Sequence, residues 1–305
     1  MAFDLKTFET SFIRIAEEIN KNNYTYSNEI LYAACGGVSI LPSSKTATST
    51  EIDRLSSVML LIGRAYAASP ERRKGAKKVN DGMITFFDAI AKNIVNHSKY
   101  ADWRCKVVTI AGRNYEYNGS LFDYDLLKES NDCVLVLNEM LREAIRKFDK
   151  EPPVDDIKNE LDDDEKGLDD VKNCISFCTK LLHFIVPHIF YIKDSISWDA
   201  IWSIYGRQSD SILQYDLQDL KIPIPQYLIG EAWNARYPNF AAGRGASDLR
   251  DTHEKEYWYH CRGCYNVSCV LKDIPLISQT KGFNGISDIH SLPRLVDSVL
   301  LHIHH

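Results

Sequence analysis

The 305-residue sequence lacks the features that would place it in a membrane, in a secretory pathway or in a fibre. No apolar run approaches the ~18–20 residues that a helix needs to cross a bilayer. The first residues, from Met1 to Lys6, contain no basic segment followed by an apolar one, so a secretion signal is not expected. Internal repeats and low-complexity tracts are also absent. We therefore expect a cytoplasmic protein that binds no membrane and keeps its eight cysteines as reduced thiols.

Three widespread catalytic motifs are missing as well. The sequence contains no G-x-x-x-x-G-K-[ST] phosphate-binding loop, no H-E-x-x-H zinc motif and no G-x-S-x-G nucleophile motif. These absences argue against the enzyme classes that the motifs define. No cofactor is expected.

One short segment invites a zinc interpretation. His260 is followed by Cys261 and Cys264, a Cys-x2-Cys pair, and His253 and Cys269 lie nearby. The same segment, however, has the periodicity of a helix, and one face of that helix would carry Tyr257, Cys261, Cys264, Ser268 and Leu271. Because the chain has no second Cys-x2-Cys pair, we expect buried thiols here and no metal site.

Charge is distributed unevenly along the chain. The net charge of −6 arises from residues 151–170, which contain ten acidic residues and only two lysines. The rest of the chain has a slight excess of positive charge. An acidic total therefore does not exclude nucleic acid as a partner, since a local basic patch is what binds phosphates. One such cluster, which is either a phosphate-binding patch or a solvated loop, consists of Arg72, Arg73, Lys74, Lys77 and Lys78.

Hydrophobic periodicity predicts a mostly α-helical protein. Apolar residues recur at helical spacing in residues 7–21, 50–68, 81–95, 131–148, 171–188, 194–206, 251–271 and 292–303. Thr50 has the position of an N-cap for the second of these helices, and residues 35–49 are expected to form a loop. The exception is the β-branched segment Cys105–Ile110, which predicts a strand or small β-hairpin because Gly112 and Gly119 follow it as turn residues.

We expect a helical domain of two lobes, with a single lobe as the alternative, and the composition divides the chain into three segments. Residues 1–150 form an N-terminal helical lobe with the basic cluster. Residues 151–206 contain an acidic connection and a helix pair, and residues 207–305 contain an irregular segment rich in aromatic residues and arginine, followed by the C-terminal helices. The acidic stretch is either a linker or the first turns of the next helix, where the helix dipole favours carboxylates.

The most informative segment runs from Ser176 to Ser195. It places Lys180 within the most apolar expected helix and Asp194 at the start of the next helix. In one interpretation both residues are structural, with Asp194 as an N-cap and Lys180 reaching the surface along its aliphatic stem. In the other, the two side chains belong to a functional site. His183 and His188, near the end of the first helix, are expected to interact with its C-terminal dipole.

The segment that begins Ser176-Phe177-Cys178-Thr179-Lys180 and ends at Asp194 resembles the core of the helix-hairpin-helix DNA glycosylases. The shared pattern is a Thr-Lys pair, an apolar helix, an apolar connection that ends in Asp, and a new helix. The segment is also similar to uncharacterised bacterial proteins with a SFxTK…P…(Y/F)xIxDS signature, some of them in phage-defence loci. The resemblance covers residues 171–205, and residues 61–73 extend the second similarity.

This resemblance implies an enzyme that hydrolyses the N-glycosidic bond of a modified or foreign base in double-stranded DNA and leaves an abasic site. Asp194 would stabilise the positive charge that develops on the sugar and orient the attacking water. Lys180 would add lyase activity if its amine attacked C1′ and formed a Schiff base. The residues expected to contact the flipped base and the DNA backbone are Arg64, Tyr66, Arg72, Arg73, Lys74, Trp233, Arg236, Tyr237 and Arg244.

Two other functions compete with this hypothesis. A nuclease or toxin of a defence system would cut phosphodiester bonds with carboxylates and Mg²⁺, and the acidic residues 155–170 would then be more than a solvated linker. A non-catalytic module that binds nucleic acid or a protein partner would keep the helical scaffold without needing Asp194. The aromatic residues of 227–259 are, in a simpler interpretation, core side chains. The oligomeric state is not predicted.

Overall fold

In the computed structural model, the residues described are 24–43, 47–65, 83–115, 124–150, 174–205, 257–258, 260–261, 263–265, 267–268 and 292–303. Their elements are α2 (Tyr24–Cys35), the 3-10 helix η1 (Gly37–Ile40), α3 (Ser49–Ala65), α4 (Met83–Val95), α5 (Tyr100–Ala111), α6 (Tyr124–Lys150), α7 (Ile175–Ile185), α8 (Ser195–Tyr205) and α14 (Leu292–Ile303). The described parts of 257–268 are also helical, and no strand occurs among the described residues. The prediction of a mostly α-helical protein is confirmed.

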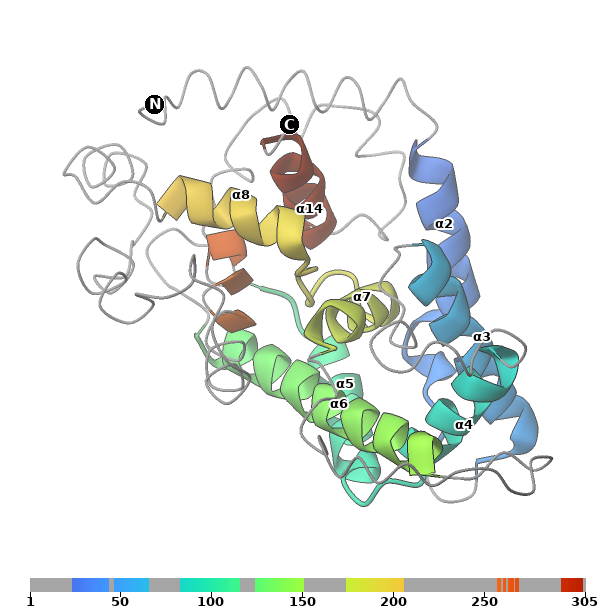
Figure 1. The fold of residues 1–305 in the computed structure, drawn as a ribbon. Coiled ribbons are helices and arrows are strands. Elements are labelled where there is room, and N and C mark those ends of the chain that lie inside the picture. The colour runs from blue at the N-terminus through green and yellow to red at the C-terminus, as the bar shows by residue number, and fades with distance from the viewer. Residues whose placement is uncertain are drawn as a thin grey trace, which may run out of the picture.

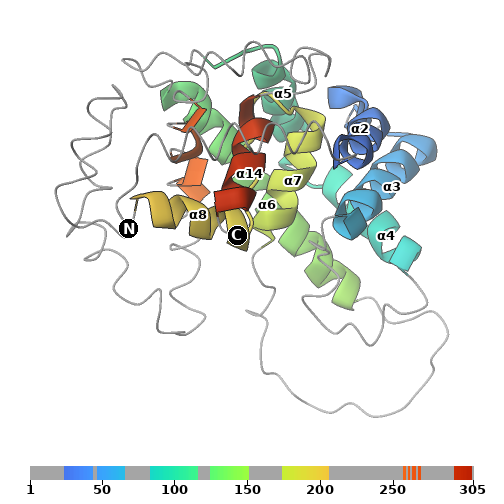
Figure 2. The ribbon, with the colours of Figure 1, turned by 90° about the horizontal axis from the view of Figure 1, so that it is seen from above.

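Helix α7 occupies the middle of the arrangement. In both views it lies between the group formed by α2, α3 and α4 and the pair formed by α8 and α14, while α6 passes along it (Figures 1 and 2). It packs against α2, α3, α6 and η1, and α14 packs against α8. Every residue of α7 except Ser176 is buried, which explains why this segment is so apolar. Buried side chains from α2 through α14 join in one continuous core.

The expected strand at Cys105–Ile110 is wrong, because this segment lies within helix α5. The buried side chains of α5 are Tyr100, Trp103, Val107 and Ile110, which recur at the spacing of a helix. Core packing of this face outweighs the weak strand preference of the β-branched residues Val107, Val108 and Thr109. A hydrogen bond from the indole of Trp103 to the Cys133 carbonyl (2.8 Å) attaches α5 to α6.

Other element boundaries also differ from the expectation. Helix α6 begins at Tyr124 instead of residue 131, and residues 37–40 of the expected loop form η1. The N-cap of α3 is Thr48 and not Thr50. The Thr48 hydroxyl accepts the Glu51 N–H (3.3 Å) and the Glu51 carboxylate accepts the Thr48 N–H (2.8 Å), which is a capping box. Helices α8 and α14 confirm the expected elements there, and no helix in the described part of the chain has the length and apolarity to cross a membrane.

Candidate active site

The connection between α7 and α8, residues 186–194, is fastened to α7 by two side chains. The Thr179 hydroxyl accepts the Lys193 N–H at 3.1 Å. The His183 ring lies 2.7 Å from the Phe190 carbonyl through Nδ1 and 2.7 Å from the Tyr32 hydroxyl through Nε2. A carbonyl only accepts, so Nδ1 donates to Phe190, while Nε2 is hydrogen-bonded to the Tyr32 hydroxyl. His183 therefore links α2 to this connection from the last turn of α7, where it is buried, and its expected interaction with the helix dipole stays a prediction.

Asp194 is the N-cap of α8. Its Oδ1 accepts the Ser197 N–H at 2.9 Å, and the Ser197 hydroxyl accepts the Asp194 N–H at 3.0 Å. This reciprocal arrangement satisfies two backbone donors at the start of the helix. The expected capping role is confirmed, and it uses only one of the two carboxylate oxygens.

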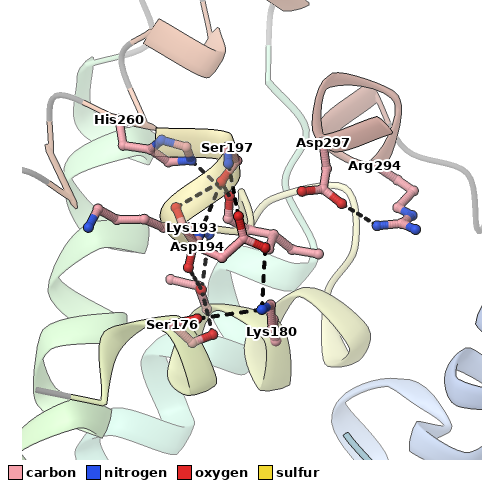
Figure 3. Close-up of polar contacts among 10 residues, drawn as sticks. Ser176, Lys180, Lys193, Asp194, Ser197, His260, Arg294 and Asp297 are labelled. Carbon is pink, nitrogen blue, oxygen red and sulfur yellow. Dashed lines mark hydrogen bonds and ion pairs between the residues drawn. The ribbon is translucent and has the colours of Figure 1, made fainter. Parts of the chain in front are cut away.

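The second oxygen of Asp194 faces Lys180, as Figure 3 shows. Lys180 Nζ lies 3.4 Å from Asp194 Oδ2, and the side chains are 4% and 22% exposed. Lys180 Nζ also lies 3.5 Å from the Ser176 hydroxyl, one turn earlier on α7. The interpretation in which Lys180 extends to the surface is therefore wrong. The structural and functional interpretations of Asp194 are compatible, because capping and ion pairing use different oxygens.

The surroundings of Asp194 keep it ionised. Burial by itself would raise the pKa of this carboxyl, but the Lys180 ammonium and the hydrogen bonds from Ser197 outweigh burial and lower the pKa below its ordinary value. A carboxylate that is charged at neutral pH, held by a helix start and only partly covered, is suited to stabilise a developing positive charge.

A second carboxyl group, which the sequence did not reveal to us, lies beside this pair. Asp297 on α14 is buried and forms an ion pair with the buried Arg294, one turn earlier on the same helix (Figure 3). Its Oδ2 contacts Arg294, whereas its Oδ1 has no hydrogen-bond partner among the described residues. Burial raises the pKa of Asp297 to about 6, with a further contribution from the charge of Asp194, although Arg294 and Lys180 act against the increase. The sequence feature that could have indicated Asp297 is the Arg-x-x-Asp spacing within an apolar helix.

His260, Cys261 and Cys264 lie on the helical segment 257–268, and His260 contacts the connection between α7 and α8. The His260 Nε2–H donates to the Ile192 carbonyl at 2.8 Å, so its Nδ1 carries no proton, and burial lowers the pKa of this histidine to about 3. Cys264 Sγ lies 3.3 Å from the same ring, and burial raises the pKa of Cys261 to about 12. The expectation of buried thiols is confirmed for both cysteines. Among the described residues, no group of three or more His, Cys, Asp and Glu could hold a metal, while His253 and Cys269 lie outside them.

No contact among the described residues places the remaining predicted site residues beside Lys180 and Asp194. Arg64 lies exposed in the last turn of α3. The other eight lie outside the described residues: Tyr66, Arg72, Arg73, Lys74, Trp233, Arg236, Tyr237 and Arg244. The candidate active site consists, at this point, of Lys180, Asp194, Arg294 and Asp297.

Comparisons with known proteins assign no family to this site. The chain matches no protein-family model, no curated protein and no solved structure. The function of the protein is therefore inferred from the geometry of the site and from the resemblance of residues 171–205.

Proposed function

We propose that this protein is a DNA glycosylase that acts in the cytoplasm on double-stranded DNA and removes a modified or foreign base. The observation that carries the proposal is the 3.4 Å contact between Lys180 Nζ and Asp194 Oδ2. An amine and an ionised carboxylate, held within one ion pair by a helix and the start of the next helix, are the two groups that glycosidic bond cleavage uses.

The chemistry follows from the charges in this pair. When the bond between C1′ and the base breaks, the electron pair leaves with the base and the sugar becomes positively charged. The fixed Asp194 carboxylate stabilises that charge and orients or deprotonates the attacking water. Because its capping oxygen is held by the Ser197 N–H at 2.9 Å, the carboxylate does not need to reorganise during the reaction. Lys180 holds the other oxygen and is itself a potential nucleophile at C1′.

The experiment is a base-excision assay in the presence of EDTA. Purified full-length protein is incubated with unmodified duplexes and with phage DNA that carries modified bases, and hot alkali then cleaves at abasic sites. We expect strand breaks that require alkali, and the released base would identify the substrate. Asp194→Asn keeps a good N-cap and removes the charge, so a loss of 10² or more in rate is expected.

The matched control is Asp132→Asn on α6, which removes a carboxylate from an exposed lysine ion pair and should leave the rate unchanged. Breaks without alkali that disappear in Lys180→Met, together with a protein–DNA adduct trapped by borohydride, would identify a bifunctional lyase. Cleavage only after Mg²⁺ is added would contradict the proposal and favour a nuclease. Excision that survives Asp194→Asn would remove Asp194 from the mechanism.

A further inference from the structure

Thr179 stands directly before Lys180 on α7, and its hydroxyl is bonded to the residue that stands directly before Asp194. This hydroxyl accepts the Lys193 N–H at 3.1 Å. Its own hydrogen faces two carbonyl groups, that of Ser176 at 3.1 Å and that of Lys193 at 3.4 Å. The Thr179 side chain is fully buried. One buried hydroxyl therefore contacts both polar groups of the Lys193 backbone and joins them to α7.

This contact lies beside the ion pair along both stretches of the chain. Thr179 and Lys193 are 14 residues apart, and the same separation holds for Lys180 and Asp194. The hydrogen bond and the ion pair thus join consecutive residues of α7 to consecutive residues at the end of the connection. Because Thr179 holds the backbone that carries Asp194, its hydroxyl limits how far the carboxylate can move from Lys180.

The other hydrogen bonds near Asp194 attach this end of the connection to different helices. The His260 Nε2–H donates to the Ile192 carbonyl at 2.8 Å, which attaches the connection to the helical segment 257–268. The Ser197 N–H donates to Asp194 Oδ1 at 2.9 Å, which fixes the carboxylate to α8. Neither bond involves α7, whereas the bond to Thr179 fixes the backbone before Asp194 relative to the helix that carries Lys180.

The ion pair is not able to set its own geometry. Lysine carries its ammonium group on a flexible stem of four carbons, so Nζ can follow a carboxylate that moves. The attraction across the 3.4 Å between Lys180 Nζ and Asp194 Oδ2 weakens with distance, and it weakens further when water enters the gap. Asp194 is 22% exposed, so solvent is close enough to do this. A rigid backbone contact such as that of Thr179 prevents the pair from widening.

We propose that Thr179 is a positioning residue for base excision, whose hydroxyl sets the distance between Lys180 Nζ and Asp194 Oδ2 by holding the backbone of Lys193. This inference rests on the proposed glycosylase function. Thr179 is buried and acts through Lys180 and Asp194, so its loss should slow the chemical step and leave the binding of DNA nearly unchanged.

The first test is the base-excision assay with EDTA, performed on the full-length protein. Thr179→Val keeps the shape of the side chain without its hydroxyl. We expect kcat to fall roughly 10- to 100-fold while KM changes less than about two-fold. Thr179→Ser keeps the hydroxyl and should restore most of kcat.

The matched control is Thr48→Val at the start of α3. Thr48 also has a hydroxyl that accepts a backbone N–H, that of Glu51 at 3.3 Å. This variant should lower the stability of the protein and leave kcat unchanged. A general effect of losing such a hydrogen bond would instead lower kcat in both valine variants.

The second test does not depend on activity. The protein is labelled with 13C at the aspartate carboxyl carbons and titrated by NMR, and the Asp194 signal is assigned by its absence in Asp194→Asn. The Lys180 ammonium lowers the pKa of Asp194, so a wider pair should raise the midpoint of this carboxyl. We expect the midpoint to rise in Thr179→Val and to stay at the wild-type value in Thr179→Ser and Thr48→Val.

A measurement on the wild type keeps the inference testable if Thr179→Val does not fold. The Lys193 N–H should exchange with solvent deuterium slowly, because it is bonded to a buried hydroxyl. Exchange of this amide as fast as in an unstructured chain would overturn the inference.

The outcomes separate the two proposals. An unchanged kcat and an unchanged Asp194 midpoint in Thr179→Val overturn the inference even if the protein excises bases. Equal losses of kcat in Thr179→Val and Thr179→Ser overturn it as well, since the hydroxyl would then not matter. A raised Asp194 midpoint in Thr179→Val, in a protein that excises no base from any DNA, supports the positioning of Asp194 by Thr179 and refutes the glycosylase function.

Discussion

Lys128 and Asp132 form an ion pair along the surface of α6, and Lys180 and Asp194 form another between α7 and the start of α8. The contact distances are similar, at 3.1 Å and 3.4 Å, but the first pair is about half exposed and the second is nearly covered. At the surface, water screens the attraction between the charges. The i, i+4 spacing within one helix is enough to bring the two groups together. In the core, each charge depends on the other, and two helices must be packed correctly before the pair exists.

The comparison shows why only one of these pairs is a candidate for chemistry. When one member of a surface pair is lost, water solvates the other, whereas a buried ammonium group that loses its carboxylate stays shielded from solvent. A buried ion pair is not needed for a stable fold, since an apolar pair of similar volume is often as stable. The burial of this pair, with Lys180 on α7 and Asp194 just before α8, is therefore an argument for the proposed reaction.

The largest effect should come from breaking the buried pair outright. Asp194→Ala leaves the Lys180 ammonium buried without its carboxylate and also removes the N-cap of α8, so we expect the free energy of unfolding to fall by about 4 kcal/mol. Urea unfolding followed by circular dichroism measures this change. Asp132→Ala should cost less than about 0.5 kcal/mol.

A capping control separates the two losses in Asp194→Ala. Thr48→Ala removes only the capping hydroxyl of α3 and should cost about 1 kcal/mol. If Asp194→Ala cost no more than Thr48→Ala, the ion pair would contribute nothing and the comparison between buried and exposed pairs would fail.

An effect of intermediate size concerns pH. The pKa of Asp297 is raised from 3.8 to about 6 in the folded protein, so between these values the folded state binds more protons than the unfolded state. Stability contributed by this group is therefore present at pH 4 and is lost as pH rises through about 6. Relative to Asp297→Asn, the wild type should lose roughly 3 kcal/mol of unfolding free energy across this range.

Asp194 acts with the opposite sign and in a different pH range. Because the pKa of Asp194 is lowered, its contribution to the free energy of unfolding is present above the ordinary aspartate pKa. This contribution is lost as the solution becomes more acidic than about pH 4. Urea unfolding at several pH values measures both slopes. A difference between wild type and Asp297→Asn that stays constant from pH 4 to pH 7 would show that Asp297 titrates as an ordinary surface carboxyl.

The smallest effect is the coupling energy between the members of each pair. In a double-mutant cycle with Lys180→Met and Asp194→Asn, the double variant should be more stable than Asp194→Asn alone, because the buried charge is removed together with its partner. We expect a coupling of about 1–2 kcal/mol for this cycle. The corresponding cycle with Lys128→Met and Asp132→Asn should give less than about 0.5 kcal/mol. Equal couplings in the two cycles would contradict the distinction made between the pairs.

Sequence periodicity was sufficient for the helices whose apolar face is long and regular. Helix α14 has the expected bounds, Leu292–Ile303, and α8, expected from residue 194, begins at Ser195. Periodicity gave the wrong element at Cys105–Ile110. This β-branched run is too short to reveal, by itself, that Tyr100 and Trp103 lie on the same buried helix face. The N-cap of α3 was misplaced by two residues for a similar reason, because several threonines and serines in a row can each cap a helix.

The candidate site was only half visible in the sequence. Lys180 and Asp194 stand out because a charged residue in an apolar helix and an aspartate at a helix start are local features. Asp297 did not stand out, since an arginine and an aspartate one turn apart are usually a solvated surface pair. In the structure α14 packs onto α8, the Arg294–Asp297 pair is buried, and the charges of Asp194 and Lys180 act on Asp297.

The sequence by itself therefore determined that the protein is built of helices, that α7 is its most apolar helix and that Asp194 caps the helix that follows. These properties depend on residues within one or two turns of each other, whose spacing is written directly in the chain. Tertiary structure alone decided that Lys180 turns inward, that Asp194 shares its two oxygens between a helix start and an ammonium group, and that Asp297 joins them. Such contacts depend on which helices pack together, and the charge of a side chain acquires its strength only from the burial that this packing creates.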